Sequence, residues 1–163
     1  RPEFYNEHGH YTKDEWTSIC DVDKEYDGHK FTLKEYIEVE NNYVNFIREL
    51  MENSEMEFVT IRRLGLYDSI SNQIAKDKRF REINEPLKDL DRSFRKGARI
   101  HRSKIGNYIR ACLRELADIS FENKGKGFEF DFGYDYYMHI RSSLPVEQLS
   151  QIARQNDLFL DPR

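Results

Sequence analysis

The residues best suited to chemistry near the N-terminus are Asp23, Glu25 and Asp27, which alternate along the chain and are followed by Gly28. Oxygen ligands at loop positions one, three and five, with glycine at six, are typical of the first half of an EF-hand calcium loop. The twelfth position of that loop requires a bidentate glutamate, but it is occupied by Lys34. The pattern therefore predicts a solvated acidic loop instead of a calcium site.

The nitrogen, sulfur and hydroxyl groups do not complete a metal or catalytic centre either. His8, His10 and Cys20 have no fourth ligand at a zinc-like spacing. Neither Cys20 nor Cys112 has a context typical of a nucleophile, and the sequence has no Gly-x-Ser-x-Gly motif and no glycine-rich phosphate loop. The isolated histidines, which we interpret as surface or structural residues, are His101 and His139. We therefore expect no catalytic residue, no metal and no cofactor, and a protein that is not an enzyme.

A basic segment, residues 92–114, contains no acidic residue. Clustered Lys and Arg side chains can follow the phosphates of a nucleic acid. The competing explanation is that these bases balance the acidic N-terminal third, because residues 1–57 hold 15 of the 30 acids and 6 of the 26 bases, a net charge of -9, and the rest of the chain is +5. The candidate nucleic-acid contacts are Arg92, Arg95, Lys96, Arg99, Arg102 and Lys104.

The run from Phe128 to Ile140 carries the strongest strand signal, because every even position is aromatic or aliphatic and the odd positions are mostly polar. Thirteen extended residues would span about 43 Å, which is too long for one straight strand in a domain of this size. We therefore expect a bulged, bent strand or a hairpin centred on Gly133. A hairpin with an odd-length loop would keep the apolar face intact by placing Phe130 opposite Tyr136 and Asp131 opposite Asp135.

The polar side of this run is the leading candidate for a macromolecular binding surface. It combines tyrosines, which are frequent interface hot spots, with fixed charges that select a partner. The competing explanation is that Tyr134 and Tyr136 pack inward and that the acids only keep a sheet face solvated. The candidate binding residues are Glu129, Asp131, Tyr134, Asp135, Tyr137 and His139.

The elements that position these residues predict an α+β fold. A helix begins at Thr32, where Thr32 to Glu35 fits a capping box. Further helices are expected to begin at Asp68–Ser69 and at Pro145, and another is expected to end near Ile119. An antiparallel or mixed sheet should pack against these helices in a single domain, residues 1–163. The expected strands lie near residues 58–64, 127–132, 134–141 and 157–160.

Residues 1–31 lack sustained periodicity, so we expect irregular structure there, with a short helix around Lys13–Cys20 and a terminus at Arg1 that is trimmed or added. Charged residues make up 34% of the 163 residues, mean hydropathy is -0.85, and 13% of the residues are aromatic, which indicates a folded, soluble protein. The sequence has no long apolar run and no secretory signal pattern. Two distant cysteines favour reduced thiols, so a cytoplasmic location without membrane contact is expected.

Three stretches of the sequence carry a resemblance to a known family. Phe132–Ile140, together with the preceding helix Ile109–Leu116, resembles the C-terminal half of bacterial immunity proteins of contact-dependent inhibition and related polymorphic toxin systems. Phe31–Tyr43 is similar to the N-terminal part of the same proteins, whereas the basic stretch 76–104 has no counterpart in them. The resemblance covers about half of the chain.

The resemblance implies a small cytosolic protein without catalysis of its own, which binds a cognate toxin domain and blocks its active site. The toxins of such systems are often nucleases, and their basic surfaces would suit an acidic strand face. The alternative is a nucleic-acid-binding or regulatory protein that uses residues 92–114.

Overall fold

The computed structural model describes residue 7, residues 16–133 and residues 136–161. Its main element is a five-stranded antiparallel sheet with the strand order β4-β3-β5-β6-β7. A separate two-stranded hairpin precedes it. The strands are β1 (Glu25–Tyr26), β2 (His29–Lys30), β3 (Phe58–Gly65), β4 (Arg99–His101), β5 (Asp118–Asn123), β6 (Phe128–Phe132) and β7 (Met138–Arg141).

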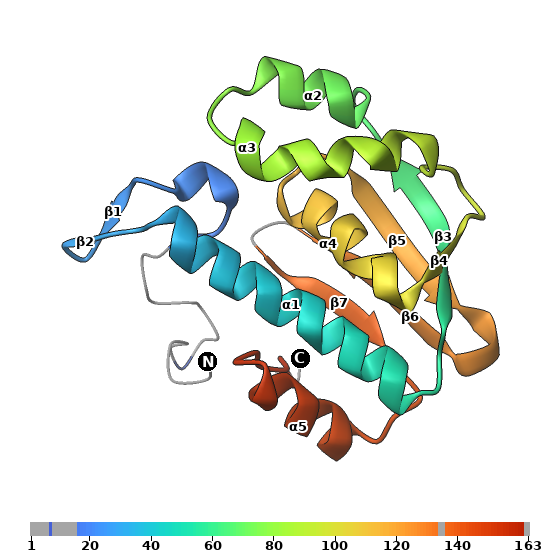
Figure 1. The fold of residues 1–163 in the computed structure, drawn as a ribbon. Coiled ribbons are helices and arrows are strands. Elements are labelled where there is room, and N and C mark those ends of the chain that lie inside the picture. The colour runs from blue at the N-terminus through green and yellow to red at the C-terminus, as the bar shows by residue number, and fades with distance from the viewer. Residues whose placement is uncertain (1–6, 8–15, 134–135, 162–163) are drawn as a thin grey trace.

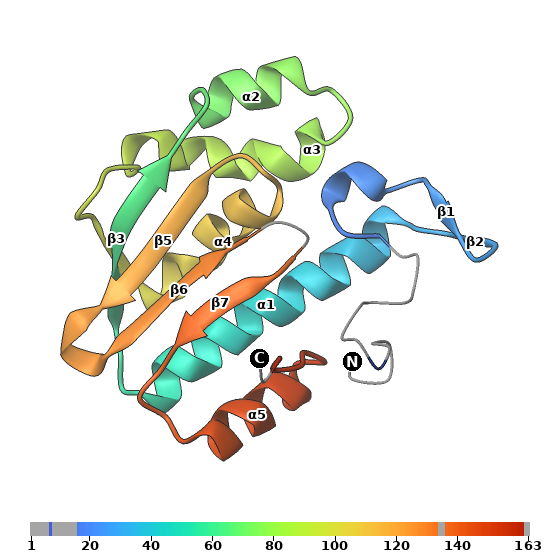
Figure 2. The same cartoon turned by 180° about the vertical axis from the view of Figure 1, so that it is seen from behind.

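The helices lie on one side of this sheet, and its other face has no helix over it, as Figures 1 and 2 show. The expected α+β fold with an antiparallel sheet is therefore confirmed. The α-helices are α1 (Leu33–Asn53), α2 (Ile70–Lys76), α3 (Arg81–Asn84), α4 (Ile105–Leu113) and α5 (Val146–Gln155). The 3-10 segments are η2 (Ile19–Asp21), η3 (Glu85–Arg92), η4 (Arg102–Lys104) and η5 (Lys124–Lys126). Among the described residues, no helix is long and apolar enough to cross a membrane.

Helix α1 begins where the capping box predicts. The Thr32 hydroxyl accepts a hydrogen bond from the Glu35 N–H at 3.3 Å, and the Glu35 carboxylate accepts one from the Thr32 N–H at 2.8 Å. Hydrogen bonds from Thr32, supported by His29, lower the pKa of Glu35 to about 2. The inward face of α1 is apolar except at Glu40, and it packs beside α4 over the sheet.

The core forms between this pair of helices and the even-numbered side chains of β6. Phe130 is 2% exposed and stacks on Phe121 of β5 with the ring centroids 4.6 Å apart. Phe128 is buried in the same cluster, while the odd-numbered neighbours Glu129 and Asp131 face away from it. The predicted alternation of buried apolar and outward-facing polar side chains is therefore present in β6.

Glu40 is 0% exposed, and its charge is balanced inside the protein. The Arg114 side chain donates two hydrogen bonds of 2.7 Å to the two Glu40 carboxylate oxygens, and Arg110 donates a third at 3.2 Å. Arg114 also donates to the Ile83 carbonyl and to Asn84 next to it, so one guanidinium joins α1, α3 and the end of α4. A bidentate arginine–carboxylate pair fixes the relative orientation of the two side chains as well as the distance between them.

Several expectations for individual elements are wrong. The helix expected to end near Ile119 stops at Leu113, because Glu115 takes a left-handed conformation with φ of 60° and turns the chain into β5. Leu158–Leu160 forms no strand: Asp157 takes φ of 53°, and the Leu158 N–H donates to the Ala153 carbonyl, so these residues close the end of α5.

The N-terminal region is more regular than expected where the structure describes it. Asp27 and Gly28 have φ values of 51° and 77° and form the two-residue turn between β1 and β2, a hairpin turn typical of an Asp-Gly pair. The calcium-like sequence is thus a hairpin. Of the short helix expected around Lys13–Cys20, residues 13–15 lie outside the described residues, and a 3-10 turn begins at Ile19.

Substitution at Arg114 should reveal how much stability depends on this buried pair. Arg114→Met leaves the Glu40 carboxylate in the core with only Arg110 beside it, so we expect a loss of about 3–5 kcal/mol in the free energy of unfolding. The double variant Glu40→Leu/Arg114→Met should recover most of that loss, because no buried charge is left unpaired. Urea denaturation followed by circular dichroism measures both.

A matched control for this prediction is Glu38→Gln, which breaks the exposed Lys34–Glu38 pair on the same helix and should change stability far less. A double variant that is as unstable as Arg114→Met would show that packing, and not the unpaired charge, causes the loss.

Candidate functional site

The candidate site is the face of the five-stranded sheet that no helix covers, called the open face below. Strand register sets which side chains meet on it: Ser120 of β5 pairs with Asp131 of β6, which pairs with His139 of β7. A second row crosses all five strands. It consists of Arg99, Thr60, Glu122, Glu129 and Arg141.

A bulge in β3 adds two arginines to this face. The pairing of β3 with β5 shifts register between Ile61 and Arg63, so Arg62 is an extra residue. Ile61 remains buried, and both Arg62 and Arg63 reach toward β5 and β6 on the open face. A regular strand would have directed one of these two arginines into the core.

The two acidic residues of β6, Glu129 and Asp131, both lie near basic side chains. Glu129 lies 2.8 Å from the Arg141 guanidinium and 3.9 Å from that of Arg62. Asp131 lies 3.9 Å from Arg62 and 3.2 Å from the His139 ring. The two acidic side chains are 25% exposed, whereas the basic side chains around them are 45–74% exposed. The acids therefore lie closer to the sheet, and the bases extend further into solvent. The open face is therefore a mosaic of both charges, and it is less acidic than the sequence suggested.

The hairpin between β6 and β7 has the expected parity but a different centre. Phe130 pairs with Ile140 and Asp131 with His139, so the expected pairing of these two residues with Tyr136 and Asp135 is wrong. The Gly133 N–H donates to the Tyr137 carbonyl at 2.7 Å, and the connection spans residues 133–137. This register places an acid opposite a histidine and avoids two opposed carboxylates.

Tyr136 explains why the connection is longer than expected. Its ring packs inward against Trp16, Tyr36 and Tyr43, with centroids 5.3, 5.7 and 5.8 Å away. The Tyr43 hydroxyl donates to the Tyr136 carbonyl at 2.6 Å, and burial raises the pKa of Tyr43 to about 12, so that hydroxyl keeps its proton. Tyr136 has φ of 60°, which costs on the order of 1–2 kcal/mol, and the packing of its ring against these three neighbours offsets this cost.

The predicted binding residues are brought together in part. Glu129, Asp131 and His139 are neighbours on the open face, and Tyr137 is 50% exposed at the end of the sheet beside them. Tyr136 packs inward, as the competing explanation held. Tyr134 and Asp135 lie outside the described residues. Tyr67, which is 97% exposed, follows β3 at the same end of the sheet.

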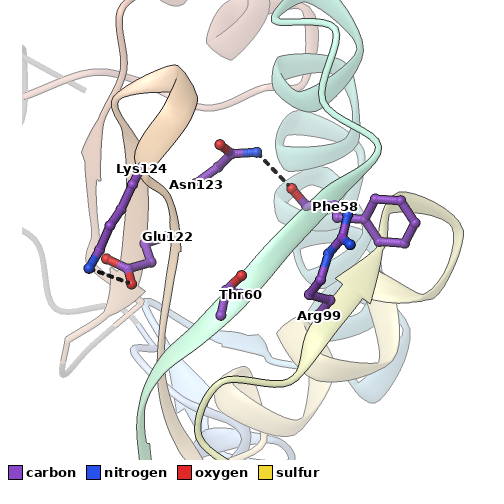
Figure 3. Close-up of a pocket in the computed structure, with 6 residues that line it drawn as sticks. All are labelled: Phe58, Thr60, Arg99, Glu122, Asn123 and Lys124. Atoms are coloured by element: carbon purple, nitrogen blue, oxygen red, sulfur yellow. Dashed lines mark hydrogen bonds and ion pairs between the residues drawn. The ribbon is translucent and has the colours of Figure 1, made fainter.

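A hollow of about 350 Å³ lies at the β4 side of the open face (Figure 3). The Arg99 guanidinium lies over the Phe58 ring, 4.3 Å from its centroid. Asn123 donates to the Phe58 carbonyl at 3.0 Å, and Lys124 lies 3.7 Å from Glu122. The lining residues are Phe58, Thr60, Arg99, Glu122, Asn123 and Lys124. Of these, only Arg99 is among the site residues that the sequence predicts; Glu122, Asn123 and Lys124 come from β5 and the turn after it, where the sequence predicts no strand.

Among the described residues, no group of three or more His, Cys, Asp or Glu side chains could hold a metal ion. Comparison of the chain with protein-family models, with curated proteins and with solved structures gave no match.

Removing the Tyr136 ring should release the 133–137 connection. Tyr136→Ala deletes a ring that contacts three aromatic neighbours, so we expect a loss of about 3–5 kcal/mol in the free energy of unfolding. Hydrogen exchange at Gly133, whose N–H donates to the Tyr137 carbonyl, should become faster. Tyr136→Phe keeps the ring and should stay within about 1 kcal/mol of wild type. Equal losses in the two variants would contradict the anchoring role of the ring.

Proposed function

We propose that this protein is an immunity protein, which binds a cognate bacterial toxin domain through the open face and blocks the toxin's active site. The observation that carries the proposal is the presentation of Tyr137. Tyr137 belongs to the connection between β6 and β7, which is anchored because the Tyr136 ring packs against three aromatic neighbours. Tyr137 itself is half exposed at the end of the open face. A tyrosine held on a rigid support costs little entropy to bind, which is typical of an interface hot spot.

The resemblance to immunity proteins of toxin systems supports the same function. Phe132–Ile140, which carries it, is the segment that forms the end of β6, the connection and the start of β7. Phe31–Tyr43 supplies Tyr36 and Tyr43, whose rings pack against Tyr136. Two of the resembling stretches therefore meet at one place in the fold.

The size of the open face indicates how a partner would cover it. Five strands at about 4.8 Å spacing, with about five residues each, make a surface of roughly 24 by 17 Å, or about 400 Å². A stable protein interface takes about 800 Å² from each partner. A toxin bound here would therefore extend beyond the strands, and the exposed end with Tyr137 and Tyr67 is the natural continuation.

The charge pattern favours selection of one partner over general attraction. Glu129 and Asp131 already face Arg62, Arg141 and His139, so a partner must offer charges in a matching order to replace or extend these pairs. Mixed charges at an interface penalise wrong partners by like-charge contacts. Such discrimination suits a protein that neutralises a single cognate toxin.

Tyr137→Ala should weaken neutralisation. The test is co-expression of this protein with the product of the neighbouring open reading frame, the expected toxin, with growth as the readout. Wild type should restore growth, and Tyr137→Ala should raise the dissociation constant for the purified toxin domain about 30-fold, which corresponds to about 2 kcal/mol. Calorimetry measures the affinity directly.

The matched control is Phe159→Ala, which removes an equally exposed aromatic side chain from the segment after α5. This variant should rescue growth like wild type. A neighbouring gene product that is harmless when expressed alone, or equal effects of the two substitutions, would contradict the proposal.

A further inference from the structure

The segment 92–104, which contains β4, carries several bases that have no ion pair. Among the described residues, five bases of the segment 92–104 have no ion pair, and only Arg102 has one, to Glu52 at 4.0 Å. The acids of the N-terminal third pair elsewhere: Glu40 with Arg110 and Arg114, for example, and Glu55 with Lys126. Charge balance within the fold thus does not account for the basic edge, which consists of Arg92, Arg95, Lys96, Arg99 and Lys104.

Within the basic edge, Arg95, Lys96 and Arg99 border the open face along its outermost strand. The Ile61 N–H donates to the Ala98 carbonyl, and the Gly97 N–H donates to the Ile61 carbonyl, so the chain before β4 continues to pair with β3. The turn at Gly97, with φ of 83°, leaves Arg95 and Lys96 exposed next to that pairing. Their cations therefore lie on the same margin as Arg99.

Aromatic rings and the hollow lie directly beside these cations. The Phe58 ring contacts both the Arg99 guanidinium and the His101 ring, the latter edge to face with centroids 5.1 Å apart. Figure 3 shows Arg99 and Phe58 on one side of the hollow and Lys124 with Glu122 on the other. A volume of about 350 Å³ is in the range of small-ligand sites. The hollow combines the cationic groups of Arg99 and Lys124 with the carboxylate of Glu122 and the flat ring of Phe58.

We infer that the basic edge and the hollow bind single-stranded nucleic acid, with phosphates along Arg95, Lys96 and Arg99 and one base in the hollow. Single strands combine a regular line of negative charge with planar groups that are free to leave the strand, and sheet faces with aromatic and basic residues bind them. An acidic protein segment would supply charge without the regular alternation of charged and planar groups, and a duplex keeps its bases stacked. The hollow lies on the open face at the end opposite Tyr137, and the inference does not rest on the proposed toxin binding.

The test uses fluorescence anisotropy with the whole protein and a labelled mixed-sequence RNA of about 12 nucleotides, a length typical of one single-strand site. Affinity should fall steeply between about 50 and 200 mM salt. Lys96→Gln/Arg99→Gln should weaken binding at least about tenfold and make the salt slope shallower by roughly 1.4, or about 0.7 for each lost phosphate contact. Thr60→Phe should fill the hollow without a charge change and weaken RNA binding while leaving the salt slope unaltered.

The control variant is Lys78→Gln/Arg154→Gln, which removes two exposed charges from the helical side of the molecule and should bind like wild type. Equal losses in the two double variants would overturn the inference, because net charge alone would explain them. It would also be overturned by no RNA binding at the lower salt concentration, or by tighter binding of a polyglutamate peptide of matched charge. Growth rescue is scored separately, so failure here leaves the toxin assay interpretable.

Discussion

One-sided burial of the sheet is the constraint on which the rest of the structure depends. Helices α1 and α4 cover one face, so each of the strands β5 and β6 must place its apolar residues on that face and leave polar residues on the other. The stacked rings of Phe121 and Phe130 lie on the covered side. The open face is thereby freed from packing, and its side chains contact mainly one another and solvent.

Helix α1 connects the core to the end of the sheet where Tyr137 lies. Tyr36, Glu40 and Tyr43 lie four and three residues apart, on one side of the helix. Glu40 holds α4 through Arg114, and the two tyrosines hold the connection between β6 and β7 through Tyr136. A change in the α1–α4 contact would therefore alter the support of Tyr137, although no residue of the open face is involved.

The features predicted correctly from the sequence are local ones. The capping box at Thr32 and the alternation of Phe128–Phe132 depend on near neighbours, and the structure has both. The α+β class follows from such elements. Pairing partners could not be predicted in the same way: the register of β7 depends on where Tyr136 packs, and Trp16, Tyr36 and Tyr43 are far from it in sequence.

Only part of the candidate site could be predicted, because the rest of it also depends on pairing between strands that are distant in sequence. Glu129, Asp131 and His139 could be placed on one face by parity alone, but their bases Arg62 and Arg141 come from separate strands, and Arg62 reaches them only through a bulge. The hollow could not be predicted, because half of its lining comes from β5 and the turn after it, where the sequence predicts no strand. Arg99 was identified by charge, without its aromatic partner.

The bulge has a consequence for how the length of the chain can vary. Ile61 and Leu64 both point toward the helices, although residues i and i+3 of a regular strand point to opposite faces. They share a face because the bulge places one extra residue between them. Deleting one of the two intervening arginines would restore simple alternation and keep both aliphatic side chains inside. The same deletion in β5 or β6 would invert every side chain beyond it. We therefore expect an insertion or deletion at this point of β3 to change the charge of the open face and to leave the interior intact.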